Sequence, residues 1–140
     1  FMLQLPLKPA MVGDKVLRHS LWMCEGGCNC VYAYGKAEHQ KWQPWSYTPA
    51  MRQLQQKLCD IVGLPYDTFN CVFINYYENG KQKLEWHFDD EYLFHCDDVR
   101  ILSFSFGAKR CFGIRKASGG IFEKVDLESK DLFFCSLWRV

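Results

Sequence analysis

The change of hydrophobic period after Gly63 constrains the fold of this chain more than any other feature of its sequence. Before that glycine, apolar residues recur at spacings of three and four, which predicts one amphipathic helix with Thr48 as its N-cap and Pro49 at its first position. After it, aromatic and β-branched residues alternate with polar ones, which predicts strands. The apolar stripe of the helix consists of Met51, Leu54, Leu58 and Ile61.

Six segments after the helix have the length and alternation of short strands, and turn residues such as Asn79-Gly80 separate them. A helix followed by strands with hairpin-like turns is typical of an α+β fold with an antiparallel sandwich or jelly-roll core. The 140 residues suffice for one domain, 1–140, and 49% of them are hydrophobic, which allows a packed core. The predicted strands are residues 69–77, 84–88, 99–106, 110–115, 121–127 and 132–138.

The residues before the helix give weaker signals. Residues 1–20 show no clear period, because prolines and a glycine interrupt them, so no regular element is assigned there. A glycine-rich loop is expected at 24–30, a short strand around Tyr32 and Tyr34, and a second loop at 36–45.

The chain contains eight cysteines, and several of them lie in apolar, strand-like runs where a free thiol packs as a small hydrophobe. No secretory signal precedes them and no apolar run has membrane-spanning length, so a reducing compartment, the nucleus or the cytoplasm, is expected, with no membrane contact. Cys24, Cys28 and Cys30 have the spacing of part of a zinc site, with His19 or His39 as a fourth ligand. Reduced loop cysteines are the favoured interpretation.

His87 and Asp89 stand two positions apart in and just after the predicted strand 84–88. Because side chains at i and i+2 of a strand point to the same face, an imidazole and a carboxylate are expected to converge. Such a pair supplies two of the three ligands in the facial triad of non-haem iron(II) oxygenases. Alone, a His-x-Asp tripeptide is a weak signal, and a polar surface loop is the alternative.

Asn75 and Tyr77 strengthen the hypothesis of a metal site. They end the preceding predicted strand and share a face by the same period of two. Both side chains can donate hydrogen bonds to a carboxylate. The sequence therefore places a candidate anion site one turn away from the candidate metal ligands.

These motifs, in this order and at these gaps, resemble the AlkB family of Fe(II)- and 2-oxoglutarate-dependent dioxygenases, in particular its DNA and RNA repair members. The resemblance extends broadly over residues 15–135, and several motifs in register make it specific. The stretches that carry it are Asn75-Tyr76-Tyr77, Asn79-Gly80, the run from Trp86 to Glu91, and the run from Ser103 to Phe112.

The resemblance implies a double-stranded β-helix, or jelly roll, and assigns a role to each matching residue. His87 and Asp89 would bind Fe(II), and Asn75 and Tyr77 would hydrogen-bond the co-substrate 2-oxoglutarate. The implied activity is oxidative demethylation of N-alkylated bases in DNA or RNA, with molecular oxygen as a further substrate and a monomer as the active form.

The resemblance also implies a site for a base that has left the stack. Glu91, with Asp90, would bind the exocyclic amine of the base, although a solvated acidic turn is an equally good interpretation of Asp90. An aromatic wall is expected beside the base, with core or loop packing as the alternative role for each residue. The candidates for that wall are Tyr32, Tyr34, Trp42 and Trp45.

The sequence departs from the family pattern at its C-terminal end. The family's second iron histidine and its Arg-x-Asn-x-x-x-Arg strand do not occur before Val140. His95 is a weak substitute for that ligand, and Arg110, Arg115 or Arg139 are substitutes for the co-substrate arginine. We expect a piece of a longer enzyme whose jelly roll is incomplete at this end; a degenerate homologue and a site completed by a partner strand are the alternatives.

Two other functions stay open at this point. One is a family relative that acts on protein or lipid, and the other is a nucleic-acid-binding remnant without catalysis. The run Asp89-Asp90-Glu91 favours a base substrate. The formal net charge of +1 neither supports nor excludes nucleic-acid binding, because a local basic groove is compatible with a balanced total.

Overall fold

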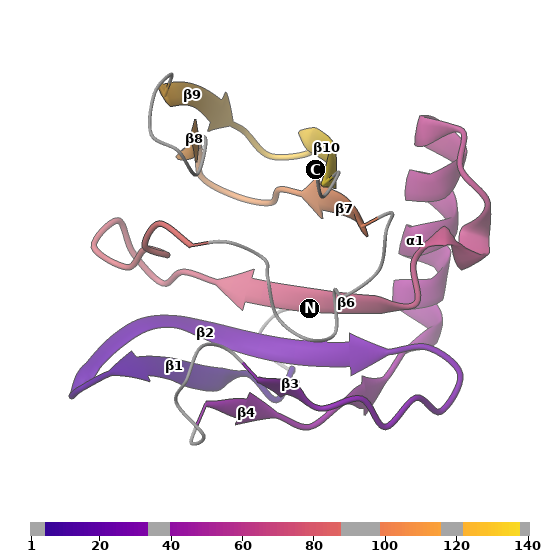
Figure 1. Ribbon diagram of the computed structural model, residues 1–140, viewed down its shortest axis with the longest axis horizontal. Coiled ribbons are helices and arrows are strands. Elements are labelled where there is room, and N and C mark those ends of the chain that lie inside the picture. Colours follow the sequence, from indigo (N-terminus) through magenta and orange to yellow (C-terminus); the bar gives the residue numbers. More distant parts are fainter. Residues whose placement is uncertain (1–4, 34–39, 88–98, 116–121, 138–140) are drawn as a thin grey trace. The chain divides into compact units, whose positions relative to one another are not determined.

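The computed structural model describes residues 5–33, 40–87, 99–115 and 122–137, and the chain divides into two compact units, Phe1–His95 and Cys96–Val140 (Figure 1). The elements of the first unit are β1 (Lys8–Val12), β2 (Lys15–Cys24), β3 (Tyr32–Ala33), β4 (Lys41–Trp42), β5 (Trp45–Ser46), α1 (Pro49–Val62), the 3-10 helix η2 (Tyr66–Thr68) and β6 (Cys71–Tyr76). Those of the second unit are β7 (Val99–Phe104), β8 (Arg110–Arg115), β9 (Phe122–Leu127) and β10 (Leu132–Leu137). Within the described ranges, no helix has the length and apolar character needed to span a membrane.

The long strand β2 organises the sheet of the first unit. It pairs antiparallel with β1 and with β6 (Figure 1), and its last two residues pair parallel with β5. The β1–β2 hairpin closes through Gly13-Asp14, and Gly13 has a φ of 57°, a left-handed conformation that glycine adopts without steric cost. This hairpin was not predicted, because an edge strand such as β1 tolerates a proline that interrupts its pattern in the sequence.

Alternation along β2 and β6 divides this sheet into two faces. One face carries Arg18, Ser20 and Trp22 of β2, and it carries Asn75 opposite Ser20 and Phe73 opposite Trp22. This face therefore has a polar end at Arg18 and Ser20 and an apolar end at Trp22. The polar end contains one of the predicted site residues, Asn75.

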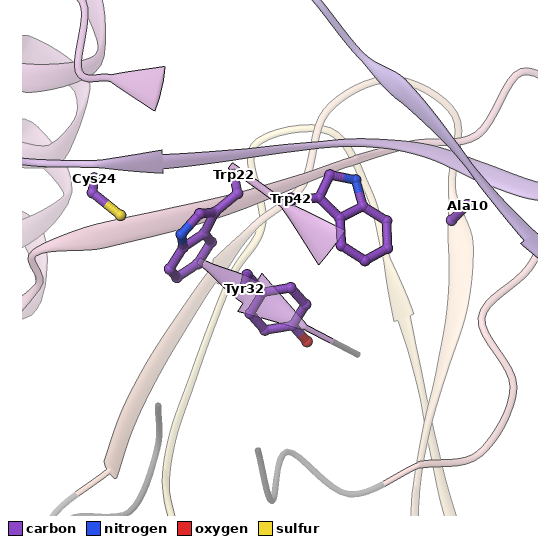
Figure 2. Close-up of a cluster of buried hydrophobic side chains, with 5 residues drawn as sticks. All are labelled: Ala10, Trp22, Cys24, Tyr32 and Trp42. Atoms are coloured by element: carbon purple, nitrogen blue, oxygen red, sulfur yellow. The ribbon is translucent and has the colours of Figure 1, made fainter. Parts of the chain in front are cut away.

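An aromatic cluster covers the apolar end of this face, and Figure 2 shows its buried members. Trp22, Tyr32 and Trp42 are each at most 4% exposed. The Phe73 ring packs among them, with its centroid 4.5 Å from that of Tyr32 and 5.4 Å from that of Trp42. Such tilted and edge-on contacts stabilise the fold beyond the area that they bury.

Helix α1 packs against the opposite face of the sheet. Met51 contacts a cluster that includes Leu21 and Met23 of β2 and the partly buried Val72 and Ile74 of β6. The two faces of the sheet thus have different roles: one supports the helix, and the other presents Asn75.

The buried stripe of α1 differs in part from the predicted one. Its most buried residues are Gln55 and Cys59, whereas Ile61 is 70% exposed. Gln55 is tolerated there because its Nε2 donates to the backbone oxygens of Tyr66 and Phe69, while its Oε1 accepts a hydrogen bond from Tyr47. An apolar pattern cannot find a buried glutamine whose partners lie elsewhere in the sequence.

The predicted ends of the helix are confirmed. Thr48 Oγ1 accepts a hydrogen bond of 3.1 Å from the backbone N–H of Met51, and Gly63 adopts the left-handed C-cap conformation with φ 69°.

We expect Thr48→Ala to lower the free energy of unfolding by about 1 kcal/mol, because the mutation leaves an N–H of the first helical turn without its cap. Urea titration followed by circular dichroism measures the change. Thr68→Ala, at the end of η2 and with no capping role, is the matched control. Equal effects of the two substitutions would contradict the assignment of Thr48 as a cap.

Glu25 links the end of β2 to α1 and η2. Its carboxylate accepts two hydrogen bonds from Arg52 Nε, at 2.9 and 3.1 Å, and one of 2.9 Å from the Tyr66 hydroxyl. Desolvation alone would raise the pKa of Glu25, but the hydrogen bonds from Arg52 and Tyr66 and the charge of Arg52 lower it overall.

This lowered pKa predicts a pH-dependent contribution to stability. Because the folded pKa lies below the unfolded value of about 4.3, the contribution is present above that value and is lost as the pH falls through the folded pKa. We expect the difference in Tm between the wild type and Glu25→Gln to shrink as the pH falls from about 6 to about 3. Glu85→Gln, on an exposed side chain, is the control; a Glu25→Gln difference that stayed constant with pH would contradict the prediction.

The second unit consists of two antiparallel strand pairs among its described residues, β7 with β10 and β8 with β9. All four strands lie where period two predicts them, within one or two residues. The expected fold class is confirmed at the coarse level, since the described chain is mostly strands with one α-helix.

Two local predictions are wrong. Residues 84–87 form no strand, although 84–88 was expected to be one; the described part of the chain offers it no pairing strand. The expected loop at 36–45 contains the short strand β4 and the start of β5, which pair with β3 and β2. Pairing of this kind depends on distant partners rather than on the local pattern.

Candidate functional site

Asn75 on β6 is the predicted site residue whose surroundings are best defined. Its Oδ1 accepts a hydrogen bond of 2.7 Å from Arg18 Nε and one of 2.9 Å from Ser20 Oγ. Since both donors approach the oxygen, the two N–H bonds of the amide point away from them. Those N–H groups are the part of Asn75 that suits an anion, so the residue fits a role in holding a carboxylate such as that of 2-oxoglutarate.

Arg18 and Ser20 were not among the predicted site residues. Both are buried, with 2% and 0% exposure, and the guanidinium carbon of Arg18 lies 5.9 Å from the centroid of the Phe73 ring. The signal that would have found them is the alternation running back from Trp22 through Ser20 to Arg18, which places all three on one face of a strand.

The predicted turn after β6 is confirmed, and its hydrogen bonds define it. The Glu78 N–H donates to Gln82 Oε1 at 2.7 Å, and the Gln82 N–H donates to the Asn79 carbonyl at 3.3 Å. Asn79 Oδ1 also accepts from the Lys81 N–H at 2.9 Å. Gln82 is only 7% exposed, so its buried side chain fixes the turn in place just before the segment that carries His87.

His87 lies on an exposed segment that follows this turn. Its Nδ1 lies 2.8 Å from the Glu85 carbonyl oxygen. A carbonyl oxygen only accepts, so Nδ1 is the donor in this contact. A histidine that binds a metal through one nitrogen commonly donates from the other to a backbone carbonyl, so the ring of His87 fits an iron ligand.

Several predicted site residues lie outside the described ranges, and Asp89 is the most important of them. Its convergence with His87 stays a prediction, and the strand that was its geometric basis is absent at 84–87. Tyr77 is described: it follows β6 directly and is partly buried. Arg110 and Arg115 lie on β8 of the second unit. The other candidates outside the described ranges are Tyr34, His39, Asp90, Glu91, His95 and Arg139.

Tyr32 and Trp42 were candidates for an aromatic wall beside a base, and both belong to the buried aromatic cluster. The ring of Tyr32 is surrounded by Trp22, Phe73 and Trp42, with centroids between 4.5 and 5.9 Å away. Tyr32 and Trp42 therefore have the alternative role, packing in the core. Trp45, in contrast, is 50% exposed.

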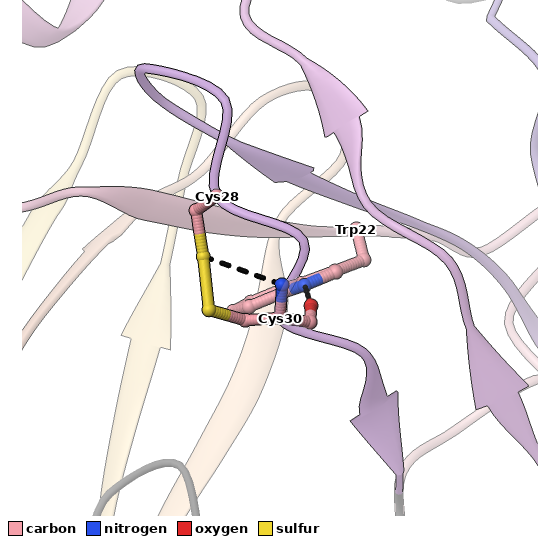
Figure 3. The surroundings of a disulfide bond; sticks show 3 residues. All are labelled: Trp22, Cys28 and Cys30. Carbon is pink, nitrogen blue, oxygen red and sulfur yellow. Dashed lines mark hydrogen bonds between the residues drawn. A yellow bond between two sulfur atoms is a disulfide. The ribbon is translucent and has the colours of Figure 1, made fainter.

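The cysteines at 24–30 differ from the favoured interpretation of reduced loop thiols. Cys28 and Cys30 form a disulfide, and the Trp22 Nε1–H donates to the Cys30 carbonyl at 2.7 Å (Figure 3). Their Cα atoms are 5.5 Å apart, a separation that a disulfide spans readily although only one residue intervenes. Cys24 stays free and buried, and burial raises its pKa. Among the described residues no three metal-binding side chains gather, so the zinc hypothesis gains no support there.

Comparison with known proteins identifies the family of this chain. The sequence matches the family model described as the 2OG-Fe(II) oxygenase superfamily over residues 8–136. It is 36% identical over 86 residues to the human protein named Alpha-ketoglutarate-dependent dioxygenase alkB homolog 3, covering 61% of this chain and 28% of that protein. The rat protein of the same name is 33% identical over 85 residues, covering 61% of this chain and 27% of that protein.

A viral relative matches over a longer stretch. Uncharacterized protein R406 of Acanthamoeba polyphaga mimivirus is 26% identical over 117 residues, covering 84% of this chain and 56% of that protein. The matched part of the chain thus spans from about a quarter to just over half of the length of these relatives. Proteins of the matched family use Fe(II) and 2-oxoglutarate, for which the Asn75 amide and the His87 imidazole are suited. The chain belongs to the 2OG-Fe(II) oxygenase superfamily and is AlkB-like within it.

Proposed function

We propose that this protein carries out Fe(II)- and 2-oxoglutarate-dependent oxidative demethylation of N-alkylated bases in DNA or RNA. Membership of the oxygenase family supports the reaction type, and the similarity to alkB homolog 3 supports an AlkB-type substrate. The observation that carries the proposal is that the Asn75 amide oxygen accepts from Arg18 and Ser20, which leaves its N–H groups suited to a co-substrate carboxylate. The contact of His87 Nδ1 with the Glu85 carbonyl also suits that ring to a metal.

The reaction balances with one oxygen molecule per methyl group. Bound Fe(II) would activate oxygen, so that one oxygen atom enters succinate as 2-oxoglutarate loses carbon dioxide and the other enters the methyl C–H bond. The resulting hydroxymethyl group leaves as formaldehyde, and the ring nitrogen keeps the electron pair of the broken C–N bond.

The side chains of this chain bind and orient the reactants. His87, through Nε2, and Asp89 bind the metal. The Asn75 N–H groups and the Tyr77 hydroxyl donate hydrogen bonds to 2-oxoglutarate, which fixes the distance between its keto acid end and the metal.

Recognition of the base requires acceptors for its exocyclic amine. Asp90 and Glu91 supply carboxylates directly after the metal-binding pair in the sequence. A base must leave its stack to reach them, and Tyr34 remains the proposed stacking residue. Tyr32 belongs to the buried cluster, so we assign it packing rather than contact with the base.

The proposal extends to the whole fold and its setting. We propose that both units belong to one jelly-roll domain, because that architecture brings strands distant in sequence to a common metal site. We also propose that the protein acts on nucleic acid as a monomer, in the nucleus or the cytoplasm.

Formaldehyde release from a methylated oligonucleotide tests the function. The intact protein is incubated with Fe(II), 2-oxoglutarate and an oligonucleotide that carries one N-methylated adenine or cytosine, and the unmethylated oligonucleotide is the control. We expect formaldehyde and succinate in equal amounts, from the methylated strand alone. Binding of the oligonucleotide without release would indicate a non-catalytic remnant; neither binding nor release would indicate a relative with a protein or lipid substrate.

A further inference from the structure

We infer that Arg18 and Ser20 are positioning residues that hold the Asn75 side chain with its N–H groups, rather than its carbonyl, toward 2-oxoglutarate. The inference rests on the proposed function, since it names how one part of the co-substrate site is built. Its basis is that both residues donate hydrogen bonds to the same atom, Asn75 Oδ1.

An arginine decides the orientation of this amide. The two ends of an asparagine amide have nearly the same shape, and one end donates while the other accepts. A guanidinium can only donate, so the amide atom 2.7 Å from Arg18 Nε is the oxygen. The reversed rotamer would set an N–H against the N–H of Arg18, and the buried guanidinium would lose an acceptor.

Burial makes this preference strong. Arg18 is 2% exposed and Ser20 is 0% exposed, so little water is present to replace the amide oxygen if the amide turns. A donor left unsatisfied in such surroundings carries its full desolvation penalty, which is larger still for a charged group. That penalty suffices to keep nearly all of the molecules in one rotamer.

The same contact makes Asn75 a better donor. A charge-assisted hydrogen bond to the amide oxygen withdraws electron density from the nitrogen, and hydrogen bonds in a buried chain polarise one another. The charge of Arg18 also favours an anion near Asn75. Arg18 and Ser20 on β2 therefore orient the Asn75 amide and strengthen its N–H groups as hydrogen-bond donors to a carboxylate.

Calorimetric titration of 2-oxoglutarate into the intact protein loaded with Mn(II) tests the inference without turnover. We expect Asn75→Ala to raise the Kd of 2-oxoglutarate by about tenfold or more, the loss of a hydrogen bond to a charged group. Ser20→Ala is expected to raise it by about three- to tenfold, Ser20→Thr to restore it, and Ser46→Ala on the exposed part of β5 to leave it unchanged.

Two further variants separate positioning from a general structural role. Asn75→Asp keeps an acceptor for Arg18, so the Tm is expected to stay at or above that of the wild type, while the Kd rises because the carboxylate repels the co-substrate and offers no N–H. Ser20→Ala in the Asn75→Ala background is expected to add nothing to the Kd, because the group that Ser20 positions is gone.

The outcomes distinguish the inference from the function on which it rests. If Asn75→Ala weakens 2-oxoglutarate and Ser20→Ala does not, or if the two effects multiply in the double variant, positioning is wrong and the co-substrate site stands. If neither Asn75→Ala nor Asn75→Asp changes the Kd, the co-substrate site itself is wrong. Should alanine at position 20 prevent folding, Ser20→Cys provides the same comparison, since a thiol is a weak donor of similar size.

Discussion

Replacement of His87 and Asp89 together by alanine is expected to abolish binding of Fe(II) and to lower formaldehyde release by more than about a hundredfold. Loss of an outer hydrogen-bond partner of a metal ligand alone costs about 10- to 100-fold in affinity or activity, so loss of two direct ligands exceeds that range. Metal affinity is measured by titration with Mn(II), and activity with the methylated oligonucleotide.

Glu85→Ala is the matched control for this double variant. It removes a neighbouring exposed carboxylate, which pairs with Lys83 at 2.9 Å, but keeps the backbone carbonyl that fixes the ring of His87. We expect normal metal binding in the control. Unchanged Mn(II) affinity in the His87 and Asp89 variant would remove the basis of the assigned metal site.

Local signals in the sequence predicted those parts of the fold that depend on local contacts. The ends of α1 at Thr48 and Gly63 follow from the capping chemistry of two residues, and the structure confirms both. The strands of the second unit follow from period two alone, and β8 (Arg110–Arg115) has the predicted bounds.

Contacts between distant residues account for most of what the sequence did not predict. The β1–β2 hairpin depends on Gly13 and on the pairing of β2 with β6, whose paired residues lie between 47 and 57 positions apart. Gln55 lies on the buried side of α1 because its partners, including Tyr47 and Tyr66, are supplied by other segments. A hydrophobic pattern contains no information about such partners.

The residues of the candidate site also divide into those that local signals predicted and those that depend on distant contacts. Asn75 was predicted from its chemistry and its place at the end of a strand, whereas Arg18 and Ser20 were missed because the strand that carries them was not recognised. The residues separated by 57 and 55 positions meet only through the pairing of β2 with β6. His87 was predicted by its motif, but the orientation of its ring depends on a carbonyl two residues away, which no motif records.

Trp22→Ala is expected to destabilise the first unit more than either Thr48→Ala or Glu25→Gln. Trp22 is 3% exposed, its ring centroid lies 5.2 Å from that of Tyr32 and 6.1 Å from that of Phe73, and its Nε1–H donates to the Cys30 carbonyl. Removal of a buried tryptophan creates a cavity and costs about 3–5 kcal/mol. Since domains are stable by only about 5–15 kcal/mol, a fall in Tm of roughly 10–20 °C is expected.

Trp45→Ala supplies the matched control, because it removes the same side chain from a site that is 50% exposed. A surface change of this kind is expected to alter the stability by less than about 0.5 kcal/mol. Thermal and urea unfolding of both variants, followed by circular dichroism, compare them directly. Because Trp22 shares its face of the sheet with Asn75, its loss is also expected to weaken 2-oxoglutarate binding at temperatures where the variant is still folded. Equal stability of the two variants would show that the aromatic cluster does not hold this face together.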